Sequence, residues 1–262
     1  MSDHLTKPLA ELADDITADG VVDADEVRKI RERIFADNVI DREEADFLFA
    51  INDVVSGKEN DPGWTTLFVE ALTQHVLDDE VSPGEVDEDE MKYLISKIQA
   101  DEKVDDVELS LLVNIIVTAK RTTESLQEFV LSSLKASILA DGMIDAQEVD
   151  MIKAVIYGAG GGAGAGVDRA EADFLFKLND AVSGSNNAPE WHSLFVEALT
   201  KHVLEDETSP GEVDEDEATW LVDKIKGDGQ VDDAEKALLS SIKGGAKSIH
   251  ESLSSFMDSV GI

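Results

Sequence analysis

Cysteine is absent from the 262-residue chain, and aromatic residues make up only 5% of it. Without cysteine there is no disulfide, zinc–thiolate site, iron–sulfur cluster or cysteine nucleophile. The low aromatic content argues against stacking platforms for nucleic-acid bases. Hydrophobic runs are short: none approaches the about 18 apolar residues of a membrane-spanning helix, and the N-terminal residues lack the apolar core of a signal peptide. We therefore expect a soluble, cytoplasmic protein without direct membrane insertion.

Basic residues are also scarce, since 22 Lys and Arg stand against 58 Asp and Glu, for a formal net charge of −36. Nucleic-acid binding needs a basic face that neutralises phosphates, so it is excluded as a general function. The charge favours divalent cations or a basic protein partner instead. Apolar residues make up 42% of the chain, enough to bury a core rather than form a disordered acidic tail.

The two halves of the chain resemble each other closely. Residues 41–57 and 168–184 are identical at 13 of 17 positions, at an offset of 127. Nearer the start of each half the offset is 122, and the five extra residues belong to a glycine-rich tract over 158–166, which we interpret as a flexible linker. The repeat predicts two tandem domains related by internal duplication, over 8–121 and 124–258.

A short pattern occurs four times in each half: an apolar β-branched residue, then Asp, two residues, and Glu. An Asp at the N-cap accepts hydrogen bonds from free amides of the first helical turn, and a Glu at N3 reaches back to the N-cap amide. Each pair therefore marks a helix start, and the following segments have helical periodicity. The pairs are Asp23 with Glu26, Asp41 with Glu44, Asp87 with Glu90, Asp105 with Glu108, Asp145 with Glu148, Asp168 with Glu171, Asp214 with Glu217, and Asp232 with Glu235.

These starts predict an all-α protein with two helical bundles of about six helices each. In the first half the expected helices lie near 7–18, 23–35, 41–56, 63–79, 87–99 and 105–119.

One of these helix starts is preceded by residues that fit the twelve-residue calcium loop of an EF-hand, over 15–26. Calcium takes clustered hard oxygen ligands, and the loop needs a glycine at its sixth position for a sharp turn. The segment has that glycine, Gly20, and its ligand positions 1, 3, 5, 9 and 12 are Asp15, Thr17, Asp19, Asp23 and Glu26.

The other copies of the loop are degraded at their front. The counterpart in the second half retains Asp141, Asp145 and Glu148. Two acidic runs, over 78–90 and 205–217, each carry eight acids in 13 residues and retain Asp79, Asp87 and Glu90, and Asp206, Asp214 and Glu217. Successive turns are only 18 residues apart, so one helix leaves one loop and enters the next, unlike a standard EF-hand pair. Two interpretations stay open: helix caps only, or caps that also hold a cation, with calcium favoured for hard oxygen ligands.

In each half, an asparagine and a histidine stand on or near an apolar helix face. Asn52 and its counterpart Asn179 either tie two helices together or act as ligands in a pocket. His75 precedes Asp79 by four residues, and His202 repeats this with Asp206. Such a pair either orients a partly buried imidazole or holds a transition metal.

The segments TADGVVDADEV (17–27) and LADGMIDAQEV (139–149), with the helix starts DREEADFLF and DRAEADFLF, resemble the tellurite-resistance TerB family. Its wider group includes the N-terminal domain of co-chaperones. The resemblance implies a cytoplasmic, non-enzymatic α-helical module linked to metal or envelope stress, with acidic cation-binding surfaces. It points to Asp19, Asp23 and Glu26, and to Asp141, Asp145 and Glu148.

Three functional hypotheses follow. The first is a non-enzymatic protein that binds divalent cations, and the second is an acidic interaction scaffold for a basic partner. The third is adaptation to high salt, which would spread acids over every exposed face, whereas the acids cluster at 15–26, 78–90 and 205–217. Signatures of a nucleophile elbow or of HExxH are absent from the sequence, and no carboxylate pair stands out as acid and base, so we expect no enzymatic activity.

Overall fold

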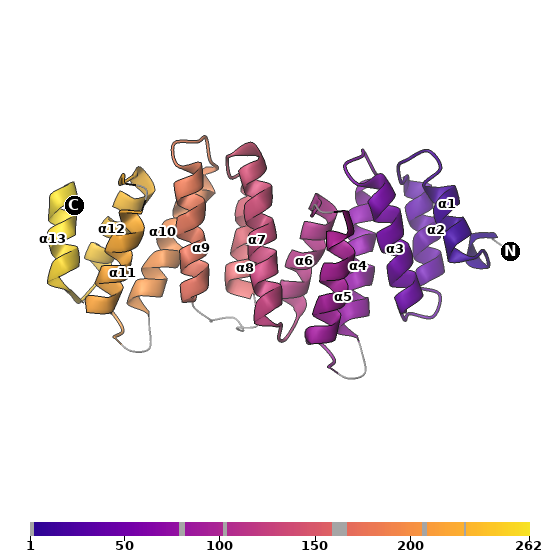
Figure 1. Ribbon diagram of the computed structural model, residues 1–262, viewed down its shortest axis with the longest axis horizontal. Coiled ribbons are helices and arrows are strands. Elements are labelled where there is room, and N and C mark those ends of the chain that lie inside the picture. The colour runs from indigo at the N-terminus through magenta and orange to yellow at the C-terminus, as the bar shows by residue number, and fades with distance from the viewer. Residues whose placement is uncertain (1–2, 79–81, 102–103, 159–166, 206–208, 228) are drawn as a thin grey trace. The chain divides into compact units, whose positions relative to one another are not determined.

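The computed structural model describes residues 3–78, 82–101, 104–158, 167–205, 209–227 and 229–262. It confirms the all-α prediction, because within these residues only two strands form, each two residues long: β1 (Glu212–Val213) and β2 (Ser248–Ile249) (Figure 1). No helix in the described part combines the length and apolar character needed to cross a bilayer.

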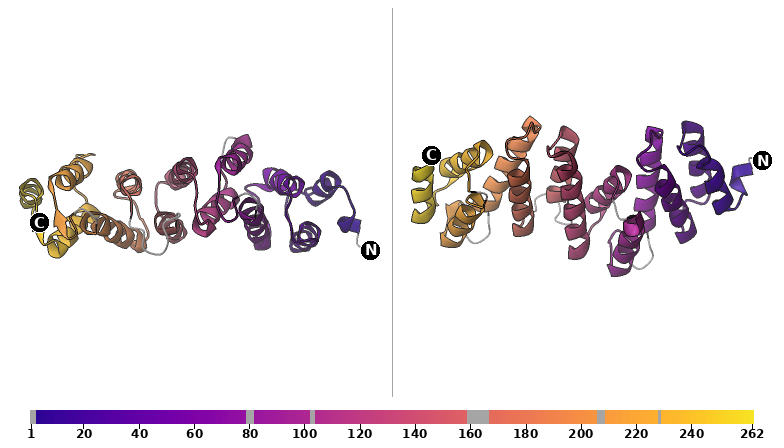
Figure 2. Two further views of the ribbon diagram at one scale, coloured as in Figure 1. Left: turned by 90° about the horizontal axis from the view of Figure 1, so that it is seen from below. Right: turned by 45° about the horizontal axis from the view of Figure 1, so that its top comes forward.

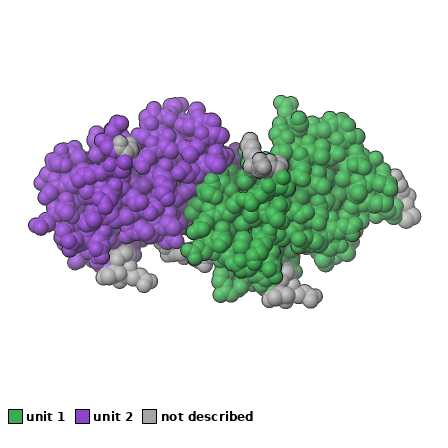
Figure 3. Space-filling view, in the orientation of Figure 1, with its two compact units in different colours: residues 1–133 green, residues 134–262 purple. Residues whose placement is uncertain are grey.

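The chain divides into two compact units, residues 1–133 and 134–262 (Figure 3). Unit 1 begins with the short 3-10 helix η1 (Asp3–Leu5), and the 3-10 helix η2 (Gln99–Asp101) follows its fifth α-helix. Its α-helices are α1 (Leu9–Ile16), α2 (Ala24–Ile34), α3 (Arg42–Val55), α4 (Pro62–Leu77), α5 (Glu88–Ile98) and α6 (Asp106–Thr118). Those of unit 2 are α8 (Ala146–Gly158), α9 (Arg169–Val182), α10 (Pro189–Leu204), α11 (Glu215–Ile225), α12 (Asp233–Gly245) and α13 (Glu251–Val260).

Helix α7 (Glu124–Asp141) belongs to both units, because their division falls between Ser133 and Leu134. Its first part corresponds to α13 at the offset of 127, and its second part corresponds to α1 at the offset of 122. One continuous helix thus takes the place of two. The predicted domain boundary at 121–124 lies at the start of this helix, and the glycine tract over 159–166 lies outside the described residues.

All eight predicted helix starts are confirmed as reciprocal caps. In each, the Asp side chain accepts the N–H of the Glu three residues later, and that Glu accepts the N–H of the Asp. Each cap satisfies amides that a helix cannot pair internally, and each contributes about 0.5–2 kcal/mol. The helices therefore begin where local chemistry places them.

Large apolar side chains fill the core of each unit around one central helix. In unit 1, α4 packs against α2, α3 and α6, and in unit 2, α10 packs against α8, α9 and α12 (Figure 2). Trp64 and Phe68 on α4 are completely buried, and Trp191 and Phe195 take the same places on α10. Removing one such aromatic side chain costs about 3–5 kcal/mol.

Candidate functional site

The turn between α1 and α2 brings the chain sharply round at Gly20, whose φ of +85° is a left-handed conformation that glycine adopts at little cost. The Gly20 N–H donates to the Thr17 carbonyl at 3.0 Å. Next to it, the Asp19 carboxylate accepts the Val21 N–H at 3.1 Å. The sequence prediction that Gly20 makes the turn is therefore confirmed.

Val22 anchors the turn to a distant segment of unit 1. Its side chain is 1% exposed. Its N–H donates to Asn60 Oδ1 at 2.9 Å, and its carbonyl accepts the Asp61 N–H at 2.8 Å. Both backbone groups of this residue are thus paired with the loop before α4, which fixes the turn against the bundle.

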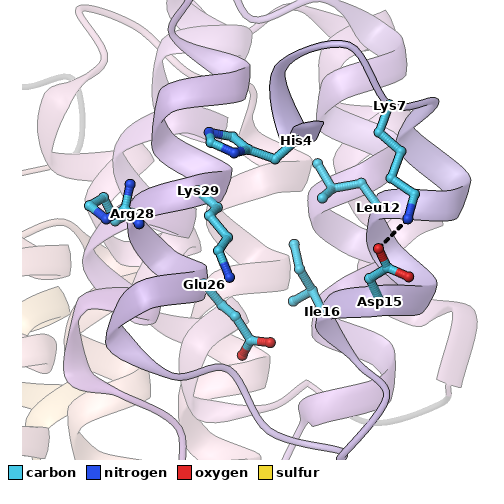
Figure 4. A pocket seen from close by; sticks show the side chains of 8 residues that line it. All are labelled: His4, Lys7, Leu12, Asp15, Ile16, Glu26, Arg28 and Lys29. Atoms are coloured by element: carbon cyan, nitrogen blue, oxygen red, sulfur yellow. Dashed lines mark hydrogen bonds and ion pairs between the residues drawn. The ribbon is translucent and has the colours of Figure 1, made fainter. Parts of the chain in front are cut away.

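A cavity of about 380 Å³ lies beside this turn and contains both ends of the predicted calcium loop (Figure 4). Asp15 on α1 and Glu26 on α2 line it, although they are eleven positions apart in the sequence. The cavity is also lined by Leu12 and Ile16 and by four residues with basic side chains: His4, Lys7, Arg28 and Lys29.

The carboxylates around the cavity already have partners. Asp15 forms an ion pair with Lys7, as the dashed line in Figure 4 marks. Glu26 accepts the Asp23 N–H at 2.9 Å, and Asp23 accepts the Glu26 N–H at 2.8 Å. The Thr17 hydroxyl donates to the Ala13 carbonyl at 2.9 Å. A cation at this turn would have to displace some of these bonds.

Glu26 has an altered titration because of its surroundings. Burial raises the pKa of its carboxyl group, and the nearby charges of Asp23 and Asp19 raise it further, against the hydrogen bond from the Asp23 N–H. A cation near Glu26 would offset the repulsion that raises its pKa. Even so, among the described residues no three acidic or histidine side chains lie together closely enough to hold a metal ion in the present arrangement.

The corresponding turn of unit 2 has the same backbone and fewer carboxylates. Gly142 has a φ of +77°, and Asp141 accepts the Met143 N–H at 3.1 Å. Asp145 and Glu148 form the reciprocal cap of α8. A serine stands at position 1 of this turn, where the first turn has Asp15. The two turns therefore share a backbone conformation but differ in the number of carboxylate ligands they could provide.

In the acidic run over 78–90, Asp87 and Glu90 cap α5, and Asp79 lies outside the described residues. The ammonium of Lys120 lies against this loop and donates to the Pro83 carbonyl at 3.0 Å. A lysine of the chain itself thus provides a positive charge at the turn.

The run over 205–217 repeats this arrangement. Asp214 and Glu217 cap α11, and Asp206 lies outside the described residues. Lys247 donates to the Pro210 carbonyl at 2.8 Å.

The interpretation of the two asparagines as ties between helices is confirmed. Asn52 on α3 donates to the Asp105 carboxylate at the start of α6 at 2.9 Å, and Asn179 donates to Asp232 at the start of α12 at 2.8 Å. Each Asp thus accepts a side chain as well as an amide of its own helix.

The two histidines bond to backbone carbonyls. The Nδ1 atom of His75 lies 2.7 Å from the Ile40 carbonyl, and that of His202 lies 2.6 Å from the Val167 carbonyl. Burial lowers the pKa of His202, although the hydrogen bond to Val167 opposes this. Each ring therefore fixes the residue that precedes a capping Asp.

Sequence reasoning missed the lysines. Lys7 reaches Asp15 from eight residues away, and Lys120 reaches Pro83 from 37 residues away. Neither spacing matches the three or four residues between neighbours on a helix, so helical periodicity does not predict these contacts.

Comparisons with protein families, with characterised proteins and with solved structures gave no match for this chain. The functional argument therefore rests on the chemistry of the site, and the resemblance to the tellurite-resistance family stays a prediction.

Proposed function

We propose that this is a non-enzymatic protein that binds a divalent cation, with calcium favoured, at the turn over 15–26. One observation carries the proposal: Asp15 and Glu26 come from different helices, yet line the same cavity. They stand at the first and last ligand positions of a calcium loop, with Asp19 and Asp23 between them. By the resemblance to the tellurite-resistance family, such a module acts in the response to metal or envelope stress.

Binding requires two rearrangements. Lys7 leaves Asp15, and this exposed ion pair is worth about 0–1 kcal/mol. Glu26 releases the Asp23 N–H, which costs part of a cap worth about 0.5–2 kcal/mol. Micromolar binding corresponds to about −8 kcal/mol, so both costs are small beside it.

The test is isothermal titration of EDTA-stripped protein with Ca²⁺, and separately with Mg²⁺, in about 150 mM salt, which screens diffuse attraction to the acidic surface. We expect saturable Ca²⁺ binding that Glu26→Gln and Asp15→Asn each abolish. Glutamine at position 26 keeps an oxygen for the cap, so the fold is preserved. The matched control is Glu148→Gln in the second turn, which should leave the binding unchanged.

The ammonium of Lys7 provides a second test, because it competes with the cation for Asp15. Lys7→Met should therefore tighten Ca²⁺ binding. If the heat of Ca²⁺ binding is weak, depends on salt and does not change in the Glu26→Gln variant, the cation proposal is wrong. The carboxylates at the helix starts would then act as caps alone, and the net charge of −36 would favour the other candidate, an acidic interaction scaffold, or co-chaperone-like module, that docks a basic protein.

A further inference from the structure

Unit 2 contains a cavity of about 460 Å³ where the end of α9, the start of α10 and the start of α12 meet. Its volume lies within the range of small-molecule sites, about 300–1,000 Å³. Its lining combines apolar surface with polar side chains, among them Asn179, Ser183 and Asp232, and Trp191 also lines it. This cavity is separate from the turn over 15–26, which belongs to unit 1.

The residues that line this cavity are smaller than their counterparts in unit 1 at three positions. At the offset of 127, Ser185 stands for Lys58, Ala188 for Asp61 and Ala234 for Val107. These replacements remove side-chain volume at three points of the lining, whereas His192, which stands for Thr65, adds volume at a fourth.

Trp191 leaves a buried hydrogen-bond donor without a partner. The residue is 2% exposed, and its indole N–H has no hydrogen bond. In unit 1 the matching Trp64 donates its indole N–H to Asn52 Oδ1 at 3.3 Å. Asn179, the counterpart of Asn52, lines the cavity together with Trp191, so both residues of the pair border the same space. A buried donor left unpaired costs about 1–3 kcal/mol, which a suitable ligand recovers.

The start of α10 is open at the same cavity. Its N-cap residue Ala188 makes no side-chain hydrogen bond, whereas Asp61 caps α4 by accepting the Gly63 N–H at 2.8 Å. Helix α10 is 16 residues long; Pro189 at its start has no N–H, and the Trp191 N–H donates to the Ala188 carbonyl at 3.0 Å.

We propose that this cavity binds a small uncharged molecule that carries hydroxyl groups, a polyol or monosaccharide. One hydroxyl group of the ligand accepts the Trp191 N–H and donates to Asn179 Oδ1. It thus bridges the two residues, whose counterparts in unit 1 are hydrogen-bonded directly. The carboxylates of Asp232 and Asp233 line the cavity and repel an anion. Asp232 already accepts Asn179 and Ser183 on one oxygen, which leaves room on its carboxylate for a further ligand hydroxyl.

The test uses the indole signals in the ¹H–¹⁵N spectrum of the full chain, which holds three tryptophans. Glycerol, myo-inositol and glucose are titrated separately, and sodium acetate serves as the anion control. We expect a saturable shift of the Trp191 signal with at least one of the uncharged probes and none with acetate. Trp64 and Trp220 already donate to Asn52 and Asp173, so their signals should stay in place.

The control variant fills the cavity with the residues of unit 1: Ser185→Lys, Ala188→Asp and Ala234→Val. These residues fit the same fold in unit 1, and the single variant Ala234→Val guards against misfolding of the triple variant. Filling the cavity should weaken binding at least about tenfold, equivalent to about 1.4 kcal/mol. The proposal is overturned if no probe moves the Trp191 signal, which would leave water alone as the partner of the indole. It is equally overturned if the shift persists in the filled variants.

Discussion

Protonation of Glu171 should control the stability of unit 2 near neutral pH. This glutamate is the N3 residue of the α9 cap, where it accepts the Asp168 N–H at 2.9 Å. Burial raises the pKa of its carboxyl group from 4.5 to about 7, and the charge of Asp168 adds to the effect, while the hydrogen bond from the Asp168 N–H opposes it.

Burial also raises the pKa of the matching residue of unit 1, but there an arginine charge opposes the shift. Glu44 holds the same place in the α3 cap, and Arg33 donates to its carboxylate at 3.2 Å. Val155 stands at the position of Arg33 in unit 2, at the offset of 122. The charged form of Glu171 is therefore desolvated without that compensating arginine.

The sign of the effect follows from the direction of the shift. Because the folded state binds the proton more tightly than the unfolded state, the stabilisation is fully present below the unfolded pKa of 4.5 and is lost as the pH rises through about 7. The difference of 7 − 4.5 = 2.5 pKa units corresponds to about 3 kcal/mol. The carboxyl group keeps some contact with water, so we expect about 2 kcal/mol after screening.

Urea denaturation of the wild type and of Glu171→Gln, at about pH 5 and about pH 8, measures this effect. Glutamine retains the cap and does not ionise, so the variant should gain about 2 kcal/mol over the wild type at the higher pH and little at the lower one. His202, whose pKa burial lowers, titrates in both proteins and cancels in the comparison. An equal difference at both pH values would refute the reasoning.

Three further predictions concern single residues, each measured by urea denaturation. Asn52→Leu should destabilise the protein by about 2–3 kcal/mol, because it removes a donor from the half-buried Asp105 carboxylate and the acceptor of the buried Trp64 N–H; an unchanged midpoint would mean that this tie is not used. Ala188→Asp should stabilise it by less than the about 1 kcal/mol of an ordinary cap, because Glu190 stands where Asp61 caps Gly63, and a Cβ at Gly63 would lie 2.9 Å from the capping oxygen. Gly20→Ala should cost about 1 kcal/mol, because alanine resists a φ of +85°, and a neutral result would contradict the assigned turn.

The helix starts could be predicted because their chemistry is local. Each cap involves an Asp and a Glu three residues apart, and no distant residue is needed to form it. The contacts of the lysine side chains behave differently. Lys7 and Lys120 reach their partners through tertiary packing, so their contacts depend on where the helices lie and not on spacing along the chain.

The sequence of helix α7 contains a helical pattern of apolar residues that the predicted helices do not include. Leu126, Val130, Leu134 and Ile138 follow each other at intervals of four, and each is fully buried. That is the periodicity of one face of a helix. The repeat predicts a boundary at 121–124, and α7 begins there and includes residues of both copies.

The differences between the two units fall on positions that do not set the fold. In unit 2, Ala188 replaces Asp61 and Val155 replaces Arg33. Trp191 replaces Trp64 without the hydrogen bond of its indole N–H. The capping box at the start of α9 and the tie from Asn179 to Asp232 persist beside these changes. Each lost contact is worth about 1 kcal/mol, whereas the core around α10 contributes far more. Many independent caps stabilise this fold, so the loss of a few polar contacts does not disrupt it. The polar groups that lose a partner in this way can then bind a ligand or a proton.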